Sequence, residues 1–256
     1  MINRSVATSV SGTLLNVSAT VRDAGNDLLV FLHGLGCSSE TFRDIWKRPD
    51  FDAYSILCLD LPGCGSSDAP KAFSYSMEDQ ALVCAEVLSH YPTNDIHLIC
   101  HSMGGAIGLL LPHEIINRTI SFANIEGNLN PEDCVFGSRE VSNVSFEVFV
   151  SELLPEFKRS SETWVKNGLE SVSPFAFYES AKSLVSWSDS GKLLRAFHEL
   201  SFRKVYIYGE HNADHPTVAT VAGISNIEIK RAGHFVMNDS PDQFYNELSN
   251  FIRDKR

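Results

Sequence analysis

Short apolar runs bounded by turn-forming residues recur along the chain and predict β-strands. The run Leu28-Leu29-Val30-Phe31-Leu32 is continuously apolar, which is typical of a strand buried on both faces of a parallel sheet. The other runs are rich in Val, Leu, Ile and Thr and end in glycine or polar residues. Strands are predicted at residues 6–10, 14–21, 28–33, 54–59, 96–101, 120–125, 204–208 and 227–230.

Longer segments with apolar residues three and four positions apart alternate with these strands and predict helices. Residues 76–90 show the pattern of a helix that covers a sheet, with apolar positions at Met77, Ala81, Leu82, Ala85 and Leu88. Further helices are predicted at 38–46, 103–111 and 242–256. Strands that alternate with helices in this way predict an α/β fold. We expect an open, mostly parallel sheet flanked by helices, with the ligand site at the carboxyl ends of the strands.

The alternation stops between residues 131 and 201, where we find no convincing strand pattern. Helices are predicted in this region at 144–154, 161–172, 174–185 and 192–200. We therefore expect a core domain made of residues 1–128 and 202–256. Residues 129–201 would form a helical cap inserted into it.

Charge and cysteine content narrow the function classes. The chain carries 21 Lys and Arg against 32 Asp and Glu, and its net charge of -11 argues against a nucleic-acid or anionic-membrane surface. Neither a signal peptide nor a membrane-spanning apolar run is evident, so a cytoplasmic location is expected. The 6 cysteines form no Cys-x-x-Cys pair, so we expect them to be reduced and mostly buried. No metal or organic cofactor is expected from the spacings.

One predicted strand, residues 96–101, runs directly into Ser102-Met103-Gly104-Gly105. This pattern predicts a strand, a sharp turn and a helix, which would lift Ser102 clear of the sheet on a strained corner. Glycine just beyond the serine would let the helix backbone pass close to the strand. Ser102 is therefore the candidate nucleophile, although Ser-x-Gly alone also occurs in ordinary loops.

Four motifs in a fixed order, together covering nearly the whole chain, resemble those of the α/β-hydrolase family. They are His33-Gly34-Leu35-Gly36, Asp60-Leu61-Pro62-Gly63, Cys100-His101-Ser102-Met103-Gly104 and Gly233-His234-Phe235. The third resembles the family's GxSxG elbow, with Cys100 in place of the first glycine. The resemblance implies an α/β-hydrolase fold in which Ser102 is the nucleophile and His234 the general base. It also implies that the backbone N–H groups of Leu35 and Met103 form the oxyanion hole.

The chain contains 9 histidines, so the choice of base needs an argument. His211 and His215 are the nearest rivals, because their loop would lie close to the site. His101 flanks the nucleophile on its strand and is expected to point elsewhere. Four others belong to the glycine turn or to helical segments: His33, His90, His113 and His198. His234, between glycine and phenylalanine after a late strand, matches the family position best.

The acid of the predicted triad is the least regular position. In the family it most often follows the strand that here ends at Gly209, but this chain has Asn212 where the aspartate is expected. Asparagine can hold one imidazole tautomer but supplies no charge to stabilise the imidazolium. Some family members carry the acid one strand earlier, where this chain has Glu126. Glu126 is the preferred acid and Asp214 the alternative, and a surface or capping role for Glu126 stays open.

The resulting hypothesis is a serine hydrolase that cleaves a small-molecule carboxylic ester, thioester or lactone through an acyl-enzyme. Cap aromatics could line an acyl pocket, but at helical spacing they more often form the core of the cap: Phe146, Phe149, Trp164, Phe175, Phe177, Tyr178 and Trp187. A carbon-carbon bond hydrolase and a non-catalytic ligand-binding protein on the same fold stay open as alternatives. Dehalogenases and epoxide hydrolases carry aspartate at the elbow and are disfavoured by Ser102. Oligomeric state is not predicted.

Overall fold

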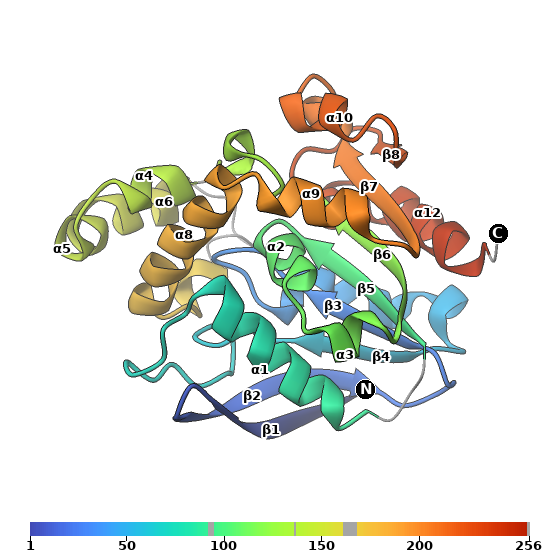
Figure 1. The fold of residues 1–256 in the computed structure, drawn as a ribbon, viewed down its shortest axis with the longest axis horizontal. Helices are drawn as coiled ribbons and strands as arrows, with labels where there is room; N and C mark the ends of the chain where they lie inside the picture. Colours follow the sequence, from blue (N-terminus) through green and yellow to red (C-terminus); the bar gives the residue numbers. More distant parts are fainter. Residues whose placement is uncertain (92–94, 136, 161–167, 255–256) are drawn as a thin grey trace.

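The computed structural model describes residues 1–91, 95–135, 137–160 and 168–254. They form an 8-stranded sheet with helices on both faces and a further group of helices to one side (Figure 1). The strand order is β1-β2-β4-β3-β5-β6-β7-β8, and β3 to β8 are mutually parallel. Only the β1–β2 and β2–β4 pairs among these are antiparallel. The predicted fold class is confirmed.

The eight predicted strands are all present. They are β1 (Ile2–Val10), β2 (Thr13–Arg22), β3 (Leu28–Leu32), β4 (Ser55–Leu59), β5 (Ile96–His101), β6 (Thr119–Ile125), β7 (Arg203–Gly209) and β8 (Ser225–Ile229). β1 begins four residues earlier than predicted, at Ile2, which pairs with Val21 of β2. Residues 2–5 are all exposed, so no apolar alternation marks them as part of a strand.

Both faces of the sheet are buried, as the apolar run in β3 predicts. Leu28, Val30 and Leu32 pack on one face with helices α1 (Met77–Ser89), α2 (Met103–Leu109) and α9 (Lys192–Glu199). Leu29 and Phe31 pack on the other face with η1 (Ser39–Lys47) and α12 (Pro241–Arg253). The sheet is therefore the middle layer of three. Because both faces are covered, a functional site is expected at the ends of the strands.

Some helices of the core differ from their predictions in type or length. The segment predicted as a helix at 38–46 is the 3₁₀ helix η1, interrupted at Phe42 (φ -104°, ψ 19°). α2 ends at Leu109, and a separate short helix follows Pro112. The remaining short elements are η2 (Pro49–Phe51), α3 (His113–Ile116), η5 (Glu210–Asn212), α10 (Pro216–Thr220) and α11 (Val236–Asp239).

Between β6 and β7 the described residues form helices and no strand. They are η3 (Pro131–Asp133), α4 (Ser138–Ser142), α5 (Phe146–Val148), the π-helical turn η4 (Phe149–Leu153), α6 (Leu154–Ser160), α8 (Pro174–Asp189) and α9. Most of the helix predicted at 161–172 lies outside the described residues. α9 packs on the face of the sheet, although it precedes the expected boundary at residue 202. The division into a core and a cap at 129–201 stays a prediction.

The helices α4, α5, α6 and α8 lie together to one side of the sheet (Figure 1). They have an apolar centre of their own, which includes Val141, Phe149 and Phe177. Arg139 of α4 and Asp189 at the end of α8 form an ion pair at 2.6 Å. No helix in the described part of the chain is both long and apolar enough to span a bilayer.

Candidate active site

Ser102 occupies the corner between β5 and α2 in a strained backbone conformation. Its φ of 52° and ψ of -120° lie in a region that residues with a side chain rarely adopt. Hydrogen bonds hold this corner on both sides: the Ser102 N–H donates to the carbonyl of Ile125 at 3.0 Å, and the Gly105 N–H donates to the carbonyl of Ser102 at 2.8 Å. The predicted strand-turn-helix geometry is therefore present.

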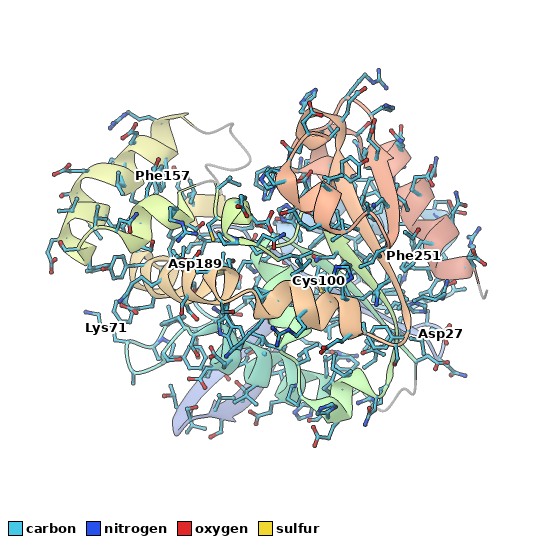
Figure 2. All side chains as sticks on the ribbon, turned by 45° about the horizontal axis from the view of Figure 1, so that its top comes forward. Asp27, Lys71, Cys100, Phe157, Asp189 and Phe251 are labelled. Carbon is cyan, nitrogen blue, oxygen red and sulfur yellow. The ribbon has the colours of Figure 1, made fainter. Side chains whose placement is uncertain are left out.

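The glycines after Ser102 are required by close packing. A Cβ atom on Gly104 would lie 2.4 Å from the carbonyl oxygen of Leu32 in β3, and one on Gly105 would lie 2.4 Å from Asn124 Oδ1. Cys100, which replaces the first glycine of the elbow, is fully buried near the centre of the molecule (Figure 2). Its Sγ lies 2.9 Å from the position of a Cβ on Gly108. Glycine on the facing helix therefore makes room for the cysteine.

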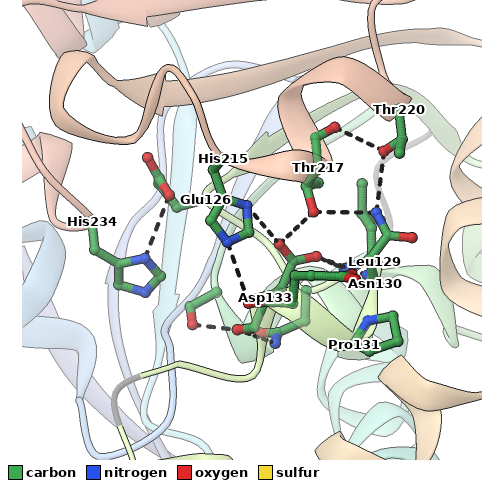
Figure 3. Close-up of polar contacts among 12 residues, drawn as sticks. Glu126, Leu129, Asn130, Pro131, Asp133, His215, Thr217, Thr220 and His234 are labelled. Carbon is green, nitrogen blue, oxygen red and sulfur yellow. Dashed lines mark hydrogen bonds and ion pairs between the residues drawn. The ribbon is translucent and has the colours of Figure 1, made fainter.

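His234 and Glu126 lie next to each other, although His234 belongs to the loop after β8 and Glu126 to the end of β6. Glu126 follows β6 directly, and its Oε2 lies 3.6 Å from His234 Nδ1 (Figure 3). The other carboxylate oxygen, Oε1, accepts a hydrogen bond from the Gly209 N–H at 2.7 Å. The two side chains are 7% and 9% exposed. The carboxylate is thus fixed by a backbone donor and directed at one nitrogen of the imidazole ring.

The alternative acid, Asp214, lies in the loop after β7 and is exposed. Within the part of the chain that the structure describes, it makes no hydrogen bond or ion pair. Asn212, at the position where the family pattern expects aspartate, ends the 3₁₀ helix η5 and is partly buried. The geometry therefore favours Glu126 over Asp214 as the partner of His234.

His101 lies directly against His234, so the expectation that it points elsewhere is wrong. The two ring centroids are 4.8 Å apart, and His101 Nε2–H donates to the carbonyl of His234 at 3.0 Å. Complete burial lowers the pKa of His101 well below its usual range, and the neighbouring His234 lowers it further. His101 is therefore a neutral side chain that holds the backbone of His234. Strand alternation alone could not reveal a contact with a loop 133 residues away.

The glycine turn after β3 passes close to the elbow. A Cβ on Gly34 would lie 3.0 Å from the Cβ of Ser102. His33 fastens this turn, because its Nε2 accepts from the Leu61 N–H at 3.0 Å while its Nδ1–H donates to the Gly34 carbonyl at 2.8 Å. Burial lowers the pKa of His33. Among the described residues, no hydrogen bond uses the N–H of Leu35 or of Met103.

Ser102 and His234 line one small cavity of about 20 Å³, close to the space that a single water molecule needs. Its walls are Gly34, Leu35, His101, Ser102, Asn128, Asp133, Val135, Ser138, Leu184, His234 and Phe235. The described cap aromatics are absent from these walls and pack in apolar clusters instead, which confirms their interpretation as core. Trp164 lies outside the described residues. A larger groove of about 720 Å³ borders η1 and the loop after β4, but neither Ser102 nor His234 lines it.

Asn128 is a site residue that the sequence reasoning missed. It is 1% exposed, and Ser102 Oγ–H donates to its Oδ1 at 3.5 Å, the long end of the hydrogen-bond range. Its own N–H donates to the carbonyl of Ser102 at 3.3 Å. The only available signal was its place two residues after Glu126, at the carboxyl end of a predicted strand.

A polar network beside the cavity connects the segment after β6 to the segment after β7 (Figure 3). Asp133 Oδ1 accepts from Thr217 Oγ1–H at 2.6 Å and lies 3.5 Å from His215 Nδ1. Its Oδ2 accepts from the N–H groups of Leu129 and Asn130, both at 2.7 Å. Burial raises the pKa of Asp133, and these hydrogen bonds oppose the rise. His215, a rival for the base, therefore pairs with Asp133 rather than with Glu126.

All 6 cysteines are buried and unbridged, as expected. Within the described residues, no group of three His, Cys, Asp or Glu side chains is arranged to hold a metal ion. The groups at or beside the cavity include the hydroxyl of Ser102, the imidazole of His234, the carboxylate of Glu126 and backbone N–H groups.

Comparison with known proteins identifies the family. The model of the Alpha/beta hydrolase family matches residues 29–247. The protein named Uncharacterized hydrolase YugF from Bacillus subtilis (strain 168) is 34% identical over 88 residues, which cover 34% of this chain and 32% of YugF. The matched segment thus spans about a third of that relative. The chain belongs to the alpha/beta hydrolase family.

Solved structures share the fold over nearly the whole chain. A mutant of the N-acyl homoserine lactonase AidH, complexed with N-hexanoyl homoserine lactone, has a TM-score of 0.78 at 18% identity, covering 99% of this chain and 98% of that chain. The esterase EaEST from Exiguobacterium antarcticum has a TM-score of 0.79 at 18% identity, covering 98% of this chain and 100% of that chain. At these identities the likeness shows the fold alone.

Proposed function

We propose that this protein is a serine hydrolase that cleaves a carboxylic ester, thioester or lactone through an acyl-enzyme. Ser102 is the nucleophile, His234 the general base and Glu126 the acid of the triad. The observation that carries the proposal is the shared cavity of Ser102 and His234, with Glu126 fixed 3.6 Å behind the imidazole. The solved structures with this fold include an esterase and a lactonase, so the fold is compatible with small-molecule substrates of this class.

In the acylation step, Ser102 Oγ attacks the carbonyl carbon of the substrate while His234 Nε2 takes the hydroxyl proton. Glu126 faces Nδ1, so it selects the tautomer whose hydrogen is on Nδ1 and whose Nε2 is the basic nitrogen, and its charge stabilises the imidazolium. The N–H groups of Leu35 and Met103 hold the oxyanion. The tetrahedral intermediate then expels the alcohol, thiol or ring oxygen, which takes the proton from His234.

In the deacylation step, water attacks the same carbonyl carbon with His234 again as the base. Ser102 Oγ leaves with the proton, and the carboxylic acid product is released. Val135, Ser138 and Leu184 of the segment at 129–201 line the cavity, which supports a role for this segment as a cap over the substrate. A cytoplasmic location remains a prediction, and no nucleic-acid or membrane partner is proposed.

The direct test is labelling by a fluorophosphonate, which reacts with activated serine hydroxyls. The full chain is expected to gain one phosphonyl group, located at Ser102 by peptide mass spectrometry, and to hydrolyse p-nitrophenyl esters from a series graded by acyl length. Ser102→Ala should abolish both signals, and Ser9→Ala, at an exposed serine on β1, is the matched control. A chain that binds an ester without labelling or turnover would instead be a non-catalytic binding protein. Labelling without turnover of any ester would favour the carbon-carbon bond hydrolase.

A further inference from the structure

Asn128 presents a buried acceptor to the cavity that Ser102 and His234 share. Its side-chain orientation is determined, because its Nδ2–H donates to the carbonyl oxygen of Asp133 at 2.9 Å and a carbonyl can only accept. Oδ1 must therefore be the atom that faces Ser102 Oγ, 3.5 Å away. The residue is 1% exposed, so bulk water does not reach this oxygen.

This acceptor loses its donor when the enzyme is acylated. The hydroxyl proton of Ser102 leaves during acylation, and the ester oxygen that replaces the hydroxyl has no hydrogen to donate. A buried acceptor without a donor is unfavourable, and water satisfies such groups where a polar cavity of sufficient size exists. In the unacylated structure the cavity of about 20 Å³ is the size of one water molecule, and Asn128, Ser102 and His234 all line it.

We propose that Asn128 positions the hydrolytic water of the deacylation step, an inference that rests on the proposed function. One hydrogen of the water is donated to Asn128 Oδ1 and the other to His234 Nε2. The water oxygen attacks the acyl carbon, His234 takes one proton, and the bond from that carbon to Ser102 Oγ breaks as His234 returns the proton to Oγ. The products are the carboxylic acid and the free serine. Asn128 orients the water and exchanges no proton.

The test separates acylation from deacylation. Stopped-flow burst kinetics with p-nitrophenyl acetate measure both steps, and mass spectrometry of acid-quenched protein measures the acyl-enzyme. Asn128→Leu keeps the approximate shape and removes the acceptor. We expect its burst rate to stay within about 3-fold of wild type. Deacylation should fall about 10- to 100-fold, so that acyl-enzyme accumulates.

Asn130→Leu is the matched control. Asn130 belongs to the same segment, and its Nδ2 donates to Thr217 and Thr220 at 3.1 Å, but it does not line the cavity. A purely structural effect of losing an amide in this segment would appear in both variants and in both steps. Should leucine at position 128 prevent folding, Asn128→Ala is expected to show the same selective loss. Asn128→Asp, which keeps an oxygen acceptor, should deacylate faster than Asn128→Leu and Asn128→Ala.

The outcomes distinguish this inference from the proposed function. If wild type forms an acyl-enzyme at Ser102 but the variants lacking the acceptor deacylate within about 2-fold of it, Asn128 does not position the water. An equal loss of rate in acylation and deacylation would also show that Asn128 does not position the water. A wild-type protein that forms no acyl-enzyme with any ester overturns both the inference and the proposed function.

Discussion

Two residues of the proposed triad carry backbone strain. Ser102 has a φ of 52° and Glu126 a φ of 47°, and neither is glycine. Such conformations cost about 1–2 kcal/mol for a residue with a Cβ and persist where the surrounding structure enforces them. Here the enforcing contacts are the hydrogen bonds from Ser102 N–H to the Ile125 carbonyl and from Glu126 N–H to the Ile207 carbonyl. Neighbouring strand ends thus hold the nucleophile and the acid in place.

Ser102→Gly should stabilise the fold while removing the nucleophile. Glycine adopts positive φ without the Cβ penalty, so we expect the free energy of unfolding to rise by about 1 kcal/mol relative to Ser102→Ala. Urea denaturation of the two variants measures this difference, and both should fail to react with a fluorophosphonate. An equal or lower stability of the glycine variant would argue against strain at the elbow.

Glu126→Gln and Asp214→Asn discriminate between the two candidate acids. Glutamine keeps the size of the side chain but removes the charge that faces His234, so we expect kcat/KM for an ester to fall by about 10²- to 10⁴-fold. Asp214 is exposed, and its variant should stay within about 2-fold of wild type. Steady-state kinetics on one p-nitrophenyl ester are sufficient. Full activity of Glu126→Gln would show that Glu126 is not the acid of the triad.

At the residue scale, Ser102 and Glu126 could be predicted as candidates because each directly follows a mostly apolar strand, and His234 because of the Gly233-His234-Phe235 motif. They could not predict Asn128 or the contact of His101 with His234. Both depend on how the chain turns after a strand end, and apolar periodicity contains no information on those turns. Cys100 is a related case, since its fit depends on Gly108 one element later.

At the scale of elements, strands buried on both faces were the most predictable, and helices shaped by tertiary contacts the least. β3, β5 and β6 are almost wholly buried. β3 is an unbroken apolar run, and β5 and β6 are mostly apolar with buried polar residues between. The 3₁₀ geometry of η1 and the π-helical turn η4 are not marked by the apolar spacing, which is similar for all helix types. The exposed start of β1 pairs with β2 through backbone hydrogen bonds. Because its side chains are exposed, no apolar pattern in the sequence marks it as a strand.

β5 also contains a buried histidine that should couple stability to pH. His97 is 2% exposed, and desolvation lowers its pKa from 6.5 to about 4, with the charge of Arg203 adding to the effect. The folded protein therefore keeps His97 neutral where the unfolded chain protonates it. This contribution to stability is complete above pH 6.5 and is lost as pH falls toward 4, by about 3 kcal/mol in total.

His97→Gln should remove this dependence. Glutamine can retain a hydrogen bond to Ser121, which His97 Nδ1 contacts at 2.6 Å, but it does not titrate. We expect the stability difference between pH 7 and pH 4.5, measured by urea denaturation, to be smaller in the variant by about 2–3 kcal/mol. His90→Gln, at an exposed position after α1, is the control and should behave as wild type. An unchanged pH dependence in His97→Gln would show that the burial of this imidazole has no effect on acid stability.

At the scale of the whole molecule, the net charge of -11 acts on every substrate that approaches the cavity. Such a field repels anions at low ionic strength, and the Debye length of about 10 Å in 0.1 M salt screens it. For an ester whose acyl chain ends in a carboxylate, kcat/KM should therefore rise about 2- to 5-fold between 0.02 M and 0.5 M NaCl. The neutral methyl analogue of the same ester is the control and should change little. Steady-state kinetics at the two salt concentrations measure the effect. A value that falls with salt for the anionic ester alone would mean that local cations near the cavity, rather than the net charge, govern its approach.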